Sequence, residues 1–580
     1  MIPINRTYAP LQALVDELAR CGMRHAVTSP GSRNAPIALT LAADERIDAI
    51  SVIDERAAGF MALGIAKAGG RPVAVTCTSG TAAANLAPAV HEAWQARVPL
   101  IVLSADRPPE LRDVGAGQAI DQIKLFGSAA KWFVEVGEHD PGRATAVHHR
   151  ALACRAYWTA AGDRRGPVHL NLPLREPLAP VPEQLDQADW AGRDGGRPWI
   201  EVREAPAQAA AADIELLTER IAGSPRGAIV CGATGEQVAP AVARLAASAG
   251  WPILAEPTSG VRCGGHDRSH VVAHYDVLLR HEGFVSEHTP DVVVRVGDTP
   301  TSKPLRAWLA GASQIVLDPH GAWHEPTRGA ETLLRTAAAP TCDAVARQLE
   351  RRAVASQLER RAVAPSDRWV SSWLEADAAV PAAVAGAPEP CEPLIYTAPA
   401  GVLAPETIVW LASSMPVRDV ESFWPAGPDR VRFLSNRGAN GIDGTLASAS
   451  GAARATGRPV LVLTGELALL HDLGGLLAAR RAGIAMTVLC VDNGGGAIFD
   501  FLPVAASADA RAYETHVTTP SGVDLRAVAA LAGMQHRKAA SAAEVRVAIA
   551  AGPGLIEVRT DRSLNVQVHR DIFARAHAAL

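Results

Sequence analysis

Short runs of β-branched and other apolar residues recur along the chain, and each run stops at a turn rich in Gly, Ser, Asn or Pro. In the first third of the chain these turns read TSPGSRNAP (28–36), CTSGTAAAN (77–85) and SADRPPE (104–110). Each turn leads into a segment with helical character. Repeated strand–turn–helix units predict a parallel, doubly wound α/β sheet. The active groups of such sheets lie at the carboxyl ends of the strands.

The same pattern predicts three α/β units. The first covers residues 1–185 and ends in a Pro-rich exit after the strand in GPVHLNLP. The second, at 195–345, contains the strands in RGAIVCGAT, PILAEPTSG, DVVVRVGDTP and SQIVLDPHG. The third, at 395–580, contains those in VWLAS, RVRFLSNRG, PVLVLTGEL, AMTVLCVDN and GLIEVRT. A length prior of ~150 residues per domain also gives about three or four domains.

Residues 346–394 are predicted to form a helical linker rich in Ala and Pro. They carry a nine-residue duplication, QLERRAVAS at 348–356 and QLERRAVAP at 357–365. Nine residues is not a helical solenoid period. We interpret the repeat as a local duplication in a surface helix or linker.

Composition and charge exclude several classes of protein. Hydrophobic residues make up 48% of the chain and charged residues 20%, and the net charge of -5 comes from interspersed signs. This pattern argues against a general nucleic-acid surface. No apolar run approaches the ~20 residues of a membrane helix, and the N-terminal segment lacks the apolar core of a signal peptide. Eight scattered cysteines without a C-x-x-C pair indicate reduced thiols in a cytoplasm.

One carboxylate stands out in the first unit. Glu55 heads the segment DERAAGFMALGIAK (54–67), whose small residues predict a tightly packed helix. A buried carboxylate is costly unless it has a partner or a role. Together with the turns at 28–36 and 77–85, this segment resembles the pyrimidine-binding domain of thiamine-diphosphate enzymes. The resemblance implies that Glu55 is catalytic: it hydrogen-bonds the aminopyrimidine ring of the cofactor and promotes ylid formation.

The third unit carries an acid after one strand and an Asn 27 positions later. LVLTGEL supplies Gly465 and Glu466, and VLCVDNGGG supplies Asn493 and Gly495. Each motif alone is also ordinary turn chemistry. Magnesium prefers octahedral oxygen ligands, and the resemblance implies that Glu466, Asn493 and the Gly495 carbonyl bind Mg²⁺, or Mn²⁺ in its place. The family acid is Asp, so Glu466 is one methylene longer.

Two further segments complete the implied cofactor site. Ser414, in SSMPVRD, follows a predicted strand, where its hydroxyl and nearby amides could hold a phosphate. The resemblance places Ile442, in SNRGANGIDG, between the two rings of thiamine diphosphate, although a core Ile fits the sequence equally well. Gly465 adds a cofactor contact. Because Glu55 and the diphosphate site meet across a subunit interface in this family, the resemblance implies a homo-oligomer, either a dimer or a tetramer.

On the substrate side the chain is most similar to the carboligases of menaquinone biosynthesis within this family. The resemblance implies that 2-oxoglutarate is decarboxylated on thiamine diphosphate and that the resulting carbanion adds to isochorismate. Both substrates carry two carboxylates, which arginine binds bidentately. The implied substrate-binding residues are Ser32, Arg33, Arg107, Gln118, Lys303, Arg418, Arg437, Phe499 and Leu502. Gly117 stands where the family has Asn, which removes a possible hydrogen bond to isochorismate.

Two alternatives remain open. Another thiamine-diphosphate carboligase or decarboxylase would share the cofactor residues but lack the set of arginines. A non-catalytic homologue that acts as a binding or regulatory protein is favoured only by Glu466 and Gly117. The sequence also leaves His471 and Asp472 open, since they could line the cofactor pocket or cap a helix.

Overall fold

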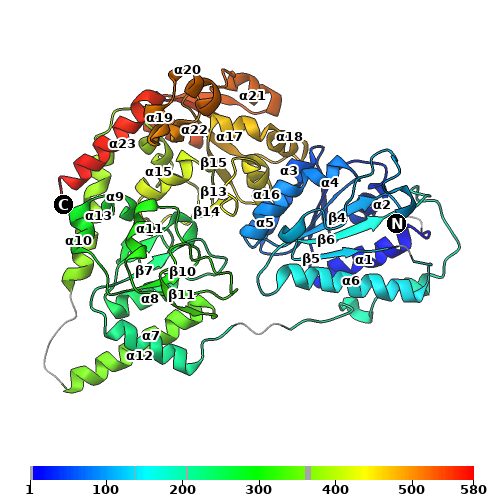
Figure 1. The fold of residues 1–580 in the computed structure, drawn as a ribbon, viewed down its shortest axis with the longest axis horizontal. Coiled ribbons are helices and arrows are strands. Elements are labelled where there is room, and N and C mark those ends of the chain that lie inside the picture. The colour runs from blue at the N-terminus through cyan, green and yellow to red at the C-terminus, as the bar shows by residue number, and fades with distance from the viewer. Residues whose placement is uncertain (1–3, 138, 204–206, 360–366) are drawn as a thin grey trace.

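Three parallel β-sheets of six strands each form the framework of the computed structural model, over the residues that it describes: 4–137, 139–203, 207–359 and 367–580 (Figure 1). Helices cover both faces of each sheet. The predicted fold class, three doubly wound α/β units, is confirmed. Residues 360–365 of the nine-residue duplication lie outside the described residues, as does residue 366. Within the part of the chain that is described, none of the helices has the length and hydropathy needed to span a bilayer.

The first sheet has the strand order β2-β1-β3-β4-β6-β5. Its strands are β1 (His25–Thr28), β2 (Asp48–Ser51), β3 (Val73–Cys77), β4 (Leu100–Asp106), β5 (Trp132–Glu135) and β6 (Val168–Pro173). The central strands are buried on both faces, so they read as continuous apolar runs. One face is covered by α3 (Glu55–Gly69) and α5 (Ala87–Gln95). The other is covered by α1 (Tyr8–Cys21), α2 (Ala35–Ala43) and α6 (Arg143–Ala161).

The second sheet has the order β12-β11-β10-β7-β8-β9. Its strands are β7 (Gly227–Cys231), β8 (Ile253–Ala255), β9 (Val271–Val272), β10 (Val292–Val296), β11 (Gln314–Leu317) and β12 (Ala330–Leu334). One face packs against α7 (Ala211–Ala222), α8 (Ala239–Ala249) and α12 (Ala338–Glu359). The other packs against α9 (Tyr275–Leu278), α10 (Glu282–Glu287), α11 (Lys303–Ala310) and α13 (Asp367–Ala385).

Helix α13 falls within the segment predicted as a linker, and it contributes to a core. Trp373 is fully buried, and Trp369 lies beside it in the same hydrophobic cluster. That cluster also contains Ile572, from the C-terminal helix α23 (Arg562–His577). The segment therefore joins the second and third units through buried aromatic packing.

The third sheet repeats the strand order of the first, as β14-β13-β15-β16-β18-β17. Its strands are β13 (Ile408–Leu411), β14 (Arg432–Ser435), β15 (Val460–Gly465), β16 (Thr487–Asp492), β17 (His536–Ala539) and β18 (Gly554–Arg559). One face carries α16 (Thr445–Thr456), α18 (Leu473–Arg481) and α21 (Leu525–Ala532). The other carries α14 (Glu392–Thr397), α15 (Met415–Phe423) and α22 (Ala542–Ala550).

The repeated strand order fixes where ligands can bind. The chain reverses its direction across the sheet between β1 and β3, and again between β13 and β15. In open parallel sheets, ligands bind outside the carboxyl ends of the strands at such a switch point. The first switch point is flanked by α4 (Thr81–Asn85) and the second by α17 (Glu466–His471).

Helices α3 and α16 join the first and third units at very short range (Figure 1). A Cβ placed on Gly64 would lie 1.9 Å from the carbonyl oxygen of Ser448. A Cβ on Gly451 would lie 2.2 Å from the carbonyl oxygen of Met61. The Ser448 hydroxyl also donates a hydrogen bond of 3.0 Å to the Phe60 carbonyl. The two backbones therefore touch where only glycine leaves room.

We predict that Gly64→Ala destabilises the protein, although Ala is normally the better helix former. The added methyl group would overlap the Ser448 carbonyl, and overpacking of this kind costs about 1–3 kcal/mol. Thermal unfolding measures the effect. The control is Gly69→Ala in the same helix, where the nearest atom to an added Cβ is 3.8 Å away. Equal melting temperatures for the two variants would show that α3 and α16 do not depend on this contact.

Candidate active site

Two arginines lie together at the carboxyl ends of β1 and β4. Arg33 is buried, and its Nη1 donates to the Leu174 carbonyl at 2.6 Å. Its closest carboxylate is the exposed Glu176, 3.6 Å away. Burial, and then the positive charge of Arg107, lower the pKa of Arg33. Two guanidinium groups that repel each other, with an exposed carboxylate as the ion-pair partner of Arg33, favour binding of an anion. Ser32 is exposed beside them.

The loop after β4 folds back over the turn that follows β3. Arg107 donates through Nε to the Gly117 carbonyl at 3.2 Å. The Ser79 hydroxyl donates to the Gln118 carbonyl at 2.8 Å. Gln118 is exposed and has a positive φ of 60°. No heavy atom lies within 4 Å of a Cβ built on Gly117, so the Asn of the family pattern would fit here without a clash.

Glu55 is the first residue of α3, directly after β2. The preceding Asp54 caps the helix by accepting hydrogen bonds from the amides of Arg56 and Ala57. Glu55 is half-buried, and among the described residues its carboxylate makes no hydrogen bond or ion pair. Its negative charge adds to the burial that raises the pKa of Cys77 at the end of β3. The carboxylate therefore lies at the strand ends and is free to accept a ligand.

A second group of polar atoms lies at the carboxyl ends of β15 and β16. Glu466 is 2% exposed, and its Oε1 accepts a hydrogen bond of 2.6 Å from the Gly495 amide. Burial raises the pKa of Glu466 to about 7. Asn493 donates through Nδ2 to Oε1 of Glu392 at 2.8 Å, and its own Oδ1 is buried without a partner.

These atoms fit a magnesium ion. A buried carboxylate and an unpartnered buried amide oxygen are costly in an apolar surrounding, and both are ligands that Mg²⁺ accepts. The third predicted ligand is the Gly495 carbonyl, which also accepts a hydrogen bond of 2.9 Å from the Ala497 amide. A carbonyl oxygen has a second lone pair for a cation. The donor set therefore suits the metal that a diphosphate cofactor requires.

Ser414 caps α15 in a strained conformation, with φ 75° and ψ -131°. Its side chain makes no capping hydrogen bond, so the first amides of α15 are available to an anion. Arg418 donates to the Ser414 carbonyl at 2.6 Å, and Arg437 donates to the Ser413 hydroxyl at 3.4 Å. Burial, and then the charge of Arg418, lower the pKa of Arg437. This is a second pair of neighbouring guanidinium groups.

The remaining predicted residues lie around these groups. Gly465 ends β15 and directly precedes Glu466. Ile442 is half-buried in the loop before α16. Phe499 and Leu502 are 36% and 39% exposed, which is more than a plain core position allows. Lys303 is exposed at the start of α11, and no hydrogen bond or ion pair among the described residues links it to the other predicted site residues.

Two buried glutamates that the sequence analysis did not identify support this arrangement. Glu92, on α5, accepts hydrogen bonds from the amides of Gly438 and Ala439 at 2.8 and 2.6 Å. It thereby fixes the loop that carries Arg437. Glu392 holds the Asn493 amide so that Oδ1 remains unpaired. The sequence signal for both is an acid within an otherwise small or apolar helical segment.

Asp472 acts as a helix cap. It is 1% exposed, and Oδ2 accepts the amides of Leu446 and Ala447 at 2.7 and 2.8 Å. These are orphan amides in the first turn of α16, which has no side-chain cap of its own. The carbonyl of His471 accepts a hydrogen bond of 3.0 Å from Arg56. The pair therefore caps α16 within the third unit and ties α3 of the first unit to it.

Three family models match consecutive parts of the chain. They are described as the N-terminal TPP binding domain of thiamine pyrophosphate enzymes, at residues 11–125, the middle domain of thiamine pyrophosphate, at 184–364, and the C-terminal TPP binding domain of thiamine pyrophosphate enzymes, at 418–558. These matches confirm the predicted resemblance and its order along the chain.

Curated relatives match almost the whole length. The chain is 41% identical to 2-succinyl-5-enolpyruvyl-6-hydroxy-3-cyclohexene-1-carboxylate synthase from Myxococcus xanthus, over 98% of this chain and 97% of the relative. The synthase from Geobacillus kaustophilus is 42% identical, over 96% of each chain. That from Chloroflexus aurantiacus is 40% identical, over 98% and 96%. The chain therefore belongs to the 2-succinyl-5-enolpyruvyl-6-hydroxy-3-cyclohexene-1-carboxylate synthases, a family of thiamine pyrophosphate enzymes.

Proposed function

We propose that the chain decarboxylates 2-oxoglutarate with thiamine diphosphate and Mg²⁺ and joins the remaining four-carbon unit to isochorismate. The product is 2-succinyl-5-enolpyruvyl-6-hydroxy-3-cyclohexene-1-carboxylate, an intermediate of menaquinone biosynthesis. The observation that carries this proposal is the pairing of arginines at two sheets, Arg33 with Arg107 and Arg418 with Arg437. The two substrates carry four carboxylates between them, and each guanidinium pair suits a dicarboxylate.

The cofactor would be held mainly by the third unit. Glu466, Asn493 and the Gly495 carbonyl would bind Mg²⁺ (or Mn²⁺), and with it the diphosphate. Ser414, Gly465 and the free amides of α15 would contact the phosphates, and Ile442 would lie against the rings. Thiamine diphosphate supplies, when bound, a carbon nucleophile and a sink for the electrons released by decarboxylation. Glu55 would hold a proton in hydrogen-bonding contact with the pyrimidine ring.

The protein would contribute binding, orientation and exclusion of water. Arg33 is buried and the other three arginines are half-buried, so they bind carboxylates more strongly than exposed arginines would, because water competes less. Ser32, Gln118 and Lys303 would add polar contacts, while Phe499 and Leu502 would form an apolar wall. Holding both substrates in one orientation converts a bimolecular step into an effectively unimolecular one.

We further propose a homo-oligomer with active sites at the subunit interface. The unpaired carboxylate of Glu55 supports this, and so do large apolar side chains that are exposed around both switch points. Ile53 is 67% exposed next to Glu55, and Phe501 and Leu502 are 37% and 39% exposed in the third unit. A second copy would cover them. A cytoplasmic location is part of the proposal, because all eight cysteines are free and buried.

A reconstitution assay tests the proposed reaction. Purified protein is supplied with thiamine diphosphate, Mg²⁺, 2-oxoglutarate and isochorismate, and isochorismate loss is followed together with the mass of the product. We expect loss that requires all four components. Folded protein that consumes no isochorismate in excess metal would reject this acceptor. Decarboxylation without isochorismate consumption would point to a different carboligase.

Glu55→Gln should lower kcat by about 10²–10⁴-fold, the range that general acid–base groups contribute. The amide cannot exchange a proton with the ring, whereas its size preserves the packing at the start of α3. Steady-state kinetics and thermal unfolding together measure the effect. Glu45→Gln, at an exposed position of the same unit, is the matched control and should keep full activity. Near-normal turnover of Glu55→Gln would refute the proposed role.

Glu466→Asp should lower the Mg²⁺ concentration needed for half-maximal activity, because Asp restores the acid of the family pattern. Glu466→Gln should raise that concentration, since a neutral amide is a weaker ligand for a hard cation. Titration of the apo-protein with Mg²⁺ measures both variants. If neither substitution moves the metal titration, Glu466 is not a ligand.

A further inference from the structure

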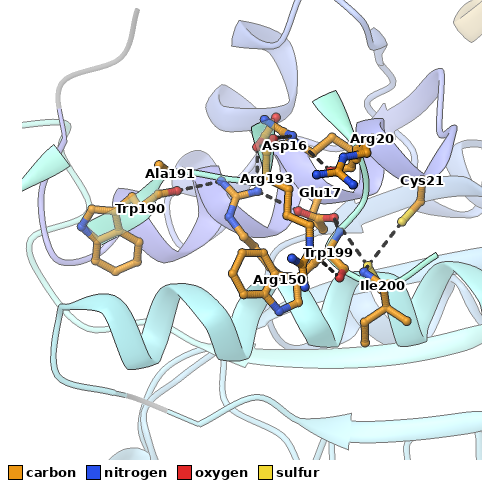
Figure 2. A network of polar contacts seen from close by, with 12 residues as sticks. Asp16, Glu17, Arg20, Cys21, Arg150, Trp190, Ala191, Arg193, Trp199 and Ile200 are labelled. Atoms are coloured by element: carbon orange, nitrogen blue, oxygen red, sulfur yellow. Dashed lines mark hydrogen bonds and ion pairs between the residues drawn. The ribbon is translucent and has the colours of Figure 1, made fainter. Parts of the chain in front are cut away.

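Two cysteines are in contact on the face of the first sheet that is covered by α1, α2 and α6. They lie away from the strand ends described above. Cys21, which Figure 2 labels, is the last residue of α1, and Cys154 lies within α6. Their sulfur atoms are 3.6 Å apart, and the side chains are 8% and 1% exposed. Among the described residues, no other two cysteines have their sulfurs in hydrogen-bond contact.

A fully buried carboxylate lies beside the two sulfurs. The Cys154 thiol donates to Oε1 of Glu17 at 3.5 Å, and the Ile200 amide donates to the Cys154 sulfur at 3.4 Å (Figure 2). Arg150, one turn before Cys154 on α6, pairs with Glu17 at 2.8 Å. Glu17 also accepts the Trp199 amide. Cys154 thus lies between a proton acceptor and a donor that stabilises negative sulfur.

These surroundings shift the pKa values of the two thiols in opposite directions. The hydrogen bond from Cys21 lowers the pKa of Cys154, and the same contact raises that of Cys21. Of the two, Cys154 is therefore the thiol that loses its proton more readily, although the Glu17 carboxylate opposes its ionisation. An attacking thiolate beside a protonated resolving thiol is the arrangement found in redox-active cysteine pairs.

We propose that Cys21 and Cys154 form an oxidisable dithiol site, which a hydroperoxide converts to a disulfide between α1 and α6. Glu17 accepts the proton of Cys154, and the thiolate attacks one oxygen of the peroxide. The O–O bond breaks, the leaving oxygen takes the proton back from Glu17, and the products are a Cys154 sulfenic acid and, for hydrogen peroxide, water. The Cys21 sulfur then attacks the Cys154 sulfur, and the hydroxyl group leaves with the proton of Cys21 as a second water. Two thiols lose two electrons in total, and the peroxide gains them.

Only a small movement of the two sulfur atoms is needed to form the disulfide. A disulfide requires the sulfurs to approach from 3.6 Å to about 2.05 Å. Cys21 is at the end of its helix, followed by Gly22 at φ 115°, so the bond does not have to distort two helix interiors. The segment that covers Cys154 is anchored by Arg20, which donates to the carbonyls of Arg193 and Arg197 at 2.8 and 3.2 Å.

A bound metal is the competing interpretation of the same residues. The sulfurs of Cys21 and Cys154 and one oxygen of Glu17 all lie within 4.8 Å of one another. However, Arg150 and the Trp199 amide already bind the Glu17 carboxylate, and the Arg150 guanidinium would repel a cation. Zinc also requires four ligands in a structural site. The contacts therefore favour the dithiol.

The test uses the reduced, full-length protein treated with hydrogen peroxide in slight excess. We expect the mass to fall by about 2 Da and dithiothreitol to reverse the change. Titratable thiols, counted after unfolding, should fall from the eight of the sequence by two. Peptide mapping should show Cys21 joined to Cys154. Because the bond closes a 133-residue separation, the melting temperature of the oxidised protein should rise by several degrees.

Single substitutions provide the controls. Cys21→Ser and Cys154→Ser should each abolish the disulfide and the rise in melting temperature. Cys263→Ser is the matched control, because Cys263 is similarly buried, at 6% exposed, and its thiol donates to the Pro425 carbonyl rather than to another cysteine. That variant should respond as the wild type does.

Three outcomes would overturn the proposal. The first is that all eight thiols survive peroxide in the folded wild type. The second is over-oxidation of either cysteine to sulfinic acid without a disulfide, which would show that the second sulfur does not resolve the first. The third is stoichiometric retention of Zn²⁺ by the reduced protein, lost in Cys154→Ser, which would make the cluster a metal site. None of these readouts depends on the carboligase activity.

Discussion

The contact between α3 and α16 is the constraint on which the rest of the structure depends. Gly64 and Gly451 let the two helix backbones touch, so the first and third units can be held in one fixed relation. The N-terminal ends of the two helices are fastened by polar contacts to two consecutive residues. Asp472 caps α16, and Arg56 bonds the His471 carbonyl beside the start of α3. The position of Glu55 follows directly, because it is the first residue of α3.

Burying a polar group costs free energy unless the group has a partner, and this cost separates two kinds of polar group in the active site. Most buried polar atoms have partners in the chain, as Glu92 shows with its two backbone amides. Two exceptions lie at the predicted metal site: among the described residues, the Oδ1 atom of Asn493 has no partner and the buried Glu466 forms no ion pair. The two arginines of each pair also repel one another, since the charge of Arg107 lowers the pKa of Arg33 and that of Arg418 lowers the pKa of Arg437. These are the places where the molecule is incomplete without its ligands.

The central strands could be predicted from the sequence because they are buried on both faces and read as apolar runs, as in β4 and β10. The sequence did not predict five strands, and all of them lie at a sheet edge: β2, β5, β9, β12 and β17. Four of them, β2, β5, β12 and β17, are partly exposed, and β9 has only two residues, so their sequences lack a long continuous apolar run. The linker assignment of 346–394 did not foresee a core helix because the partners of Trp373 lie in distant parts of the chain.

The site residues, like the strands, could be predicted where the signal is local in the sequence and not where it depends on distant contacts. The candidate residues at strand ends could be named because motif and spacing are local. Glu392 could not, because its partner Asn493 is 101 positions away, and Glu92 lies 346 positions from the Gly438 amide that it binds. Contacts of this range are decided by the tertiary fold. The choice between capping and cofactor contact for Asp472 was settled only by the position of the α16 amides.

The central claim is that two copies of the chain complete each active site, with Glu55 from one and the metal ligands from the other. Mixing two inactive variants, Glu55→Gln and Glu466→Ala, after subunit exchange tests it most directly. A shared site predicts recovery of about one quarter of wild-type activity, because half of the randomly formed dimers are mixed and each contains one intact site. No recovery, with mixed dimers demonstrated by mass, would contradict the claim and place both glutamates in a site within one chain.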